Sequence, residues 1–209
     1  MTADRLTAAS GIAFAVTFAA GVIILGEMFG MSGDADTTYD DYYADDHPAD
    51  IAGAVLLAVS GLLFPAFVSG LVQDMSARLQ ALSLVFASVF AALVMVAASA
   101  AGAIPGARAF GAVFGDDDQA TTAVWLPATM SYILLCVAGA LTASCTIVLM
   151  AVAPGSVLAS GAPRYLSLLV AAILLLGPMV MPLVVLPLWA GGLSIWLLAR
   201  RPDTVNSLR

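Results

Sequence analysis

The sequence has no lysine, one histidine, one glutamate and two cysteines, and only 10% of its 209 residues are charged. About a quarter of the residues of a soluble globular domain are charged, so water is not the main solvent of this chain. The net charge of -7 argues against the basic surface that nucleic-acid binding requires. The two cysteines lie in one apolar run without a C-x-x-C spacing, which indicates neither a disulfide framework nor a zinc site.

Hydrophobic residues make up 62% of the chain and fall in long uninterrupted runs. A helix needs roughly 20 apolar residues to cross about 30 Å of hydrocarbon, and only helices or closed barrels satisfy the backbone there. The runs predict an all-α fold, a polytopic transmembrane helical bundle in a single domain. The predicted spans are approximately 6–31, 51–72, 79–102, 123–152, 164–179 and 182–199.

The last apolar stretch, from Tyr165 to Ala199, is too long for one span, because its 35 residues would form a helix of about 52 Å. Pro178 and Pro182 each remove a backbone donor and disfavour helix in the residue before them, so a tight turn is expected there. Division gives two spans of roughly 17 residues, which is short for a crossing. Five spans are therefore the alternative to six.

Arginine placement favours six spans with both termini in the cytoplasm, because basic residues are retained on the cytoplasmic side of short loops. Only Arg108 is outside in that arrangement. Five spans would leave three arginines inside and four outside, which is no bias. The arginines that six spans place inside are Arg5, Arg78, Arg164, Arg200, Arg201 and Arg209.

Six spans also place most aspartates in two outer acidic loops, 32–50 and 103–122. Carboxylates beside the only histidine suit a divalent cation such as calcium, although the spacing lacks the glycine and the closing glutamate of an EF-hand. The simpler interpretation is a solvated acidic loop. The candidate metal ligands are Asp34, Asp36, Asp40, Asp41, Asp45, Asp46, His47, Asp116, Asp117 and Asp118.

Glu27 is the only charged side chain predicted inside a span, and intramembrane carboxylates are candidate proton or cation sites. Its place near the outer end of the first span also fits a carboxylate solvated at the membrane boundary. Prolines are candidate helix breaks, which transporters use to expose backbone groups, although proline is also ordinary in membrane helices. These candidate breaks are Pro65, Pro127, Pro178, Pro182 and Pro187.

Aromatic residues fall near both expected membrane surfaces, with Trp125 at the outer one and Tyr165 and Trp196 at the inner one. The sequence has no G-x-S-x-G, H-E-x-x-H, Walker or G-x-G-x-x-G motif, so it offers no catalytic residue. The lack of lysine, with many alanines and aspartates, suggests a prokaryote of high GC content or salt-adapted habit. The expected location is therefore the prokaryotic cytoplasmic membrane.

Two segments carry a resemblance to known sequences: Tyr-Tyr-Ala-Asp-Asp at 42–46, before the second span, and the closing run from Leu186 to Leu198. With these segments the chain resembles the uncharacterised multi-pass membrane proteins, grouped as domains of unknown function, that are common in actinobacteria. The resemblance covers most of the chain loosely. It implies a hairpin near the carboxyl end and no catalytic residue.

The function expected from these features is that of a non-enzymatic membrane protein, an accessory subunit or helix-packing component with acidic loops outside. Its surroundings would be the lipid bilayer and either other membrane subunits or further copies of itself, and the only cofactor considered is the divalent cation. The alternative is a small transporter or ion-responsive sensor that uses Glu27 and the acidic loops. A membrane enzyme ranks third.

Overall fold

The computed structural model describes residues 3–26, 48–103, 105–106, 127, 129–176 and 182–199. The described residues contain no β-strand, so the predicted all-α class is confirmed. A π-helical segment, η1 (Leu134–Gly139), precedes α7. The α-helices are α1 (Ala3–Ile24), α3 (Pro48–Leu71), α4 (Ala77–Ala101), α7 (Ala140–Val152), α8 (Gly161–Leu175) and α9 (Pro182–Ala199).

Helix length separates two groups within the described part of the chain. Four helical segments are long and apolar enough to cross a membrane, whereas α8 and α9 are apolar but have only 15 and 18 residues. At 1.5 Å per residue, α8 is about 22 Å long and α9 about 27 Å. The long segments are Arg5–Ile24, Ala49–Leu71, Ala77–Ala101 and Thr129–Val152, the last of which contains η1.

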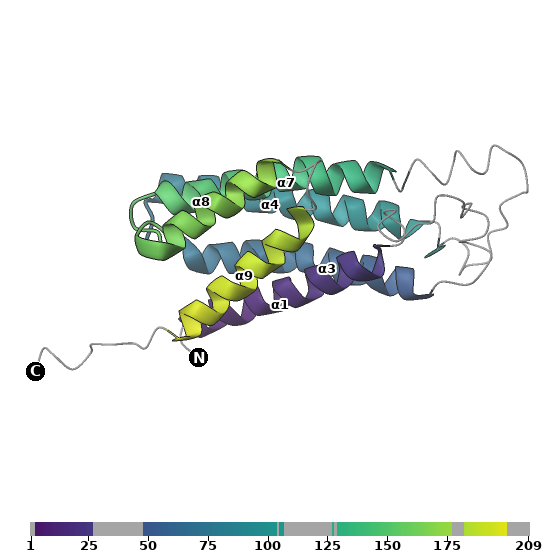
Figure 1. Cartoon of the computed structure of the whole chain (residues 1–209), viewed down its shortest axis with the longest axis horizontal. Helices are drawn as coiled ribbons and strands as arrows, with labels where there is room; N and C mark the ends of the chain where they lie inside the picture. Colours follow the sequence, from purple (N-terminus) through teal and green to yellow (C-terminus); the bar gives the residue numbers. More distant parts are fainter. Residues whose placement is uncertain are drawn as a thin grey trace, which may run out of the picture.

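The helices form a closed ring in the order α1, α3, α4, α7, α8 and α9, because each packs against the next and α9 packs against α1. Figure 1 shows that α1 begins and α9 ends at one end of the bundle. At that same end α3 leads into α4, and α7 leads into α8. Neighbouring helices therefore run in opposite directions around the ring.

The centre of the ring is filled by four buried phenylalanine rings from three helices. Phe14 and Phe18 come from α1, Phe64 from α3 and Phe90 from α4. The ring centroids of Phe64 and Phe90 are 4.5 Å apart, and those of Phe14 and Phe64 are 5.1 Å apart. Such aromatic pairs contribute about 0.5–1.5 kcal/mol each beyond the area they bury.

The outward sides of the helices are apolar as well. Val16 is 62% exposed, Val85 57% and Leu188 69%, and each has further exposed apolar neighbours on its own helix. Helices that are apolar on both the inward and the outward side suit hydrocarbon surroundings rather than water. The length of four helical segments, their apolar composition and their exposed apolar side chains are therefore compatible with an integral membrane protein.

Glycine lets α1 and α3 approach each other closely. A β-carbon at Gly21 would lie 2.9 Å from the backbone nitrogen of Leu57 and 3.0 Å from the carbonyl oxygen of Gly53. Both contacts are with backbone, which cannot rotate away as a side chain can. Gly21 therefore fixes how near the two helix axes lie at this level.

The prolines behave differently from one another. The predicted breaks at Pro65 and Pro187 are wrong, because α3 and α9 continue past them. A membrane helix tolerates such a proline when neighbouring groups satisfy the freed carbonyl. Pro182 is the first residue of α9, where a missing N–H costs little, so it marks the predicted division of the last stretch. Pro127 is helical, and Pro178 lies outside the described residues.

Replacing Gly21 with alanine should destabilise the bundle by about 1–3 kcal/mol, the usual cost of overpacking a filled interface. The measurement is thermal unfolding of the purified protein in mild detergent. Gly192→Ala is the matched control, since nothing lies within 4 Å of a β-carbon there. Equal melting temperatures for the two variants would show that α1 and α3 are not packed as described.

Candidate functional site

Most residues predicted to carry chemistry fall outside the described part of the chain. Glu27 lies there, and so do all the predicted metal ligands, from Asp34 to His47 and from Asp116 to Asp118. Among the residues that are described, no group of three or more His, Cys, Asp or Glu side chains could hold a metal ion. The calcium site and the role of Glu27 remain predictions.

Asp50 occupies a different position from the predicted one. The sequence placed it in the outer loop 32–50, but α3 begins at Pro48 and Asp50 lies in its first turn, only 3% exposed. Proline favours the first position of a helix, and a carboxylate in the first turn is stabilised by the helix dipole. Pro48 was therefore the signal that could have moved the start of this helix, and Asp50 with it, into the bundle.

Small residues surround this end of α3. A β-carbon at Gly53 would lie 3.1 Å from Cγ of Leu25 on the α1 side, and one at Gly102 would lie 3.0 Å from Cβ of Ala54 on the α4 side. Three helices thus converge near Asp50 through contacts between apolar groups.

Buried hydroxyl groups join neighbouring helices in the second half of the chain. The hydroxyl of Ser144 on α7 donates to the carbonyl oxygen of Ala171 on α8 at 2.8 Å. The indole N–H of Trp189 on α9 donates to the hydroxyl of Ser167 on α8 at 3.0 Å. Ser131 donates across to the carbonyl of Ala97 on α4 at 2.8 Å. These three hydrogen bonds therefore hold neighbouring helices together. The hydroxyls of Thr142 and Thr146 instead donate to carbonyl oxygens of their own span.

Ser83 is the exception among the buried side chains that the structure describes. Its hydroxyl is fully buried and is the one buried side-chain nitrogen or oxygen there without a hydrogen-bond partner. It lies on the inward stripe of α4 with Ala87 and Phe90. A buried hydroxyl without a partner costs about 1–3 kcal/mol of desolvation, so Ser83 does not stabilise the packing of α4.

The π-helical segment η1 is a local feature that the sequence did not predict. A π-helix makes one turn with an extra residue and often occurs near functional sites. Here it contains Cys136, a buried free thiol, and ends at Gly139. A β-carbon at Gly139 would lie 3.2 Å from the carbonyl oxygen of Leu134, so a small residue suits the wider turn.

No protein-family model, curated protein or solved structure matches this sequence. The resemblance to the actinobacterial proteins of unknown function is therefore still a prediction. What the molecule offers chemically rests on its own residues. These are a buried carboxylate at one end of α3 and hydroxyl groups that bond helix to helix.

Two serine substitutions should act in opposite directions on stability. Ser144→Ala removes a bond between α7 and α8, which in membrane proteins is worth about 0.6–2 kcal/mol, so the melting temperature should fall. Ser83→Ala removes a hydroxyl that has no partner, so stability should stay unchanged or rise. Thermal unfolding in detergent measures both. A larger loss for Ser83→Ala than for Ser144→Ala would contradict this assignment.

Proposed function

We propose that the chain is a non-enzymatic component of a prokaryotic cytoplasmic membrane, with six helices embedded in the bilayer and both termini in the cytoplasm. The observation that carries this proposal is a ring of apolar helices whose centre is filled by phenylalanine rings. A filled centre suits a packing role. It gives no support to a path for a substrate through the described part of the bundle.

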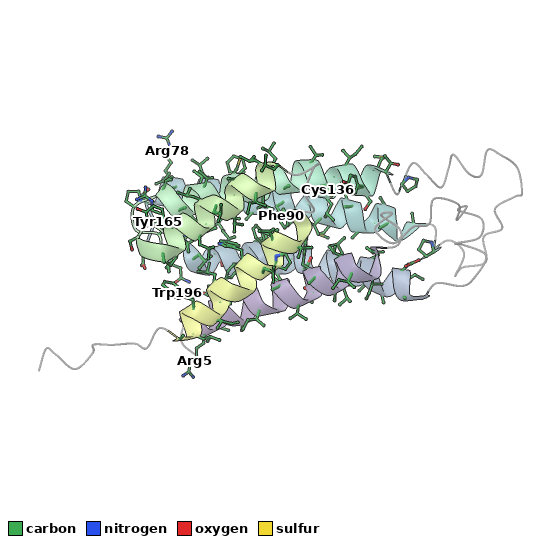
Figure 2. The ribbon with its side chains drawn as sticks, in the orientation of Figure 1. Arg5, Arg78, Phe90, Cys136, Tyr165 and Trp196 are labelled. Carbon is green, nitrogen blue, oxygen red and sulfur yellow. The ribbon has the colours of Figure 1, made fainter. Side chains whose placement is uncertain are left out.

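The sidedness is supported by the described arginines. Arg5, Arg78 and Arg164 each lie in the first turn or two of a helix that begins at the same end of the bundle, and all three are exposed. Figure 2 shows Arg5, Arg78, Tyr165 and Trp196 at this end. Basic residues are retained in the cytoplasm and aromatic rings favour the headgroup layer, so we assign this end to the cytoplasmic side.

The lengths of α8 and α9 affect the count of complete crossings. Ala171 lies level with Ser144 on α7, and α8 ends only four residues later, whereas the fourth span continues outward to Thr129. In Figure 1 the facing ends of α8 and α9 lie part-way along the longer helices. Six complete spans therefore require the bilayer to thin beside this pair, at fractions of a kcal/mol per Å. Both termini lie on the same side of the membrane whether α8 and α9 cross it completely or turn back part-way.

Within this proposal the protein is an accessory subunit or forms a small oligomer, with its acidic loops outside. Large apolar side chains on the outward faces supply surface for packing against other membrane helices.

Purification in mild detergent, followed by detergent-corrected light scattering, should give a particle whose protein mass exceeds the 21.3 kDa of one chain. Mass spectrometry then identifies whether the extra mass is a second copy or a different subunit. A stable particle with the mass of one chain and no partner would contradict the subunit proposal.

Asp50 favours a second candidate function, a small transporter or ion-responsive sensor, because a nearly fully buried carboxylate within a span is costly. Replacing Asp50 with Asn and Glu27 with Gln separates the two proposals. If the packing role is correct, reconstituted vesicles should show the same proton and cation flux for wild type and both variants. Asp74→Asn, at an exposed site on the other end, is the control. Flux that disappears in either test variant alone would establish transport.

A further inference from the structure

One side of α8 is not covered by the bundle. The helix packs against α7 and α9 through Ser167, Val170, Ala171 and Leu174. On the opposite side, spacings of four, three and four residues place Tyr165, Leu169, Ala172 and Leu176 in one line along the axis, because positions i, i+4, i+7 and i+11 share a helix face. All four are exposed.

The length of this line matches one leaflet of a bilayer. Leu176 lies eleven positions after Tyr165, which corresponds to about 16 Å along a helix. Half of a hydrocarbon core of about 30 Å is about 15 Å. The leucines of this face, which are 57% and 59% exposed at 169 and 176, therefore extend from the bundle end to about mid-membrane depth.

A cation and a phenol lie at the end of this apolar face. Arg164 is exposed in the first turn of α8, and Tyr165, which is 73% exposed, follows it. No described residue forms an ion pair or hydrogen bond with the Arg164 guanidinium. Guanidinium groups bind phosphate through two parallel hydrogen bonds, and tyrosine favours the headgroup layer.

We propose that this α8 surface, formed by Arg164, Tyr165, Leu169, Ala172 and Leu176, binds an anionic phospholipid. Arg164 holds the headgroup phosphate, Tyr165 lies beside the glycerol region, and one acyl chain lies along the three apolar residues. A free phosphate ion would use only the charged end of the surface. A partner helix that spans the membrane would leave the arginine without a counter-charge, so a lipid of one leaflet fits the surface better.

Arg164 lies at the end of the bundle that we assign to the cytoplasmic side, so the lipid belongs to the cytoplasmic leaflet. This choice of leaflet rests on the orientation proposed above, but the binding itself does not. A protein in detergent is not inserted in a bilayer, so lipid binding measured there does not depend on its membrane orientation. A carboxyl terminus found outside the cell would move this lipid to the outer leaflet without changing its affinity, so the two proposals fail separately.

The test is native mass spectrometry of the purified full chain titrated with phosphatidylglycerol and, separately, with phosphatidylcholine. The wild type should prefer phosphatidylglycerol, and Arg164→Gln should weaken its binding about fivefold, the effect of one arginine near an anionic surface. Arg164→Lys keeps the charge without the paired hydrogen bonds and should fall between them. Phosphatidylcholine is the control lipid, and its binding should not differ between the wild type and Arg164→Gln.

Two outcomes would overturn the proposal. One is equal phosphatidylglycerol affinity of wild type and Arg164→Gln when both melt at the same temperature. The other is complete displacement of the lipid by excess inorganic phosphate, which would show a site for the phosphate ion alone. Leu169→Ser should weaken lipid binding without affecting any phosphate binding, and the absence of such an effect would also count against the acyl-chain contact.

Discussion

Close packing between helices is the interaction on which the rest of this bundle depends. Lipid tails are as apolar as leucine, so burying an apolar side chain between helices gains little that contact with lipid would not supply. Helices associate instead where their backbones can approach and their side chains interlock. Gly21 on α1 meets the backbone of α3, Gly70 on α3 meets the side chain of Thr7, and Gly11 faces Phe67 and Ser194. These glycines determine how closely α1, α3 and α9 lie.

The centre of the ring follows from that spacing. With α1 and α3 held close, Phe14 and Phe64 come into ring contact, and Phe90 of α4 joins them from the other side. On the opposite arc, where the helices are shorter, hydrogen bonds from Ser144 and Trp189 make the connections instead. The two arcs thus use different interactions, one mainly packing and the other packing with buried hydrogen bonds. In both arcs the side chains in the interior stabilise helix packing.

Much of the fold could be predicted from the sequence, because a helix in lipid needs a long apolar run and such runs are visible directly. The division of the last stretch also followed from local chemistry, since Pro182 cannot donate to a helix turn before it. Local chemistry does not decide the outcome at Pro65. Whether an interior proline ends a helix depends on the neighbouring helices, which sequence spacing does not reveal, and α3 continues past it.

The candidate site was less predictable than the fold. Asp50 looked like one of many loop aspartates, and its burial depends on a helix start two residues earlier and on the packing of α1 and α4 against α3. Ser83 and η1 left no mark in the sequence pattern, because an absent hydrogen-bond partner and an extra residue in a turn are both set by tertiary packing. The α8 surface is intermediate. Its spacing can be read from the sequence, but which side of α8 the bundle leaves uncovered cannot.

In the six-helix membrane bundle proposed above, both termini of the chain lie on the cytoplasmic side. This arrangement can be tested by fusing the carboxyl terminus, in separate strains, to a fluorescent protein that folds in the cytoplasm and to alkaline phosphatase, which is active only outside. We expect fluorescence without phosphatase activity. Phosphatase activity without fluorescence would place the carboxyl terminus outside the cell and exclude this arrangement.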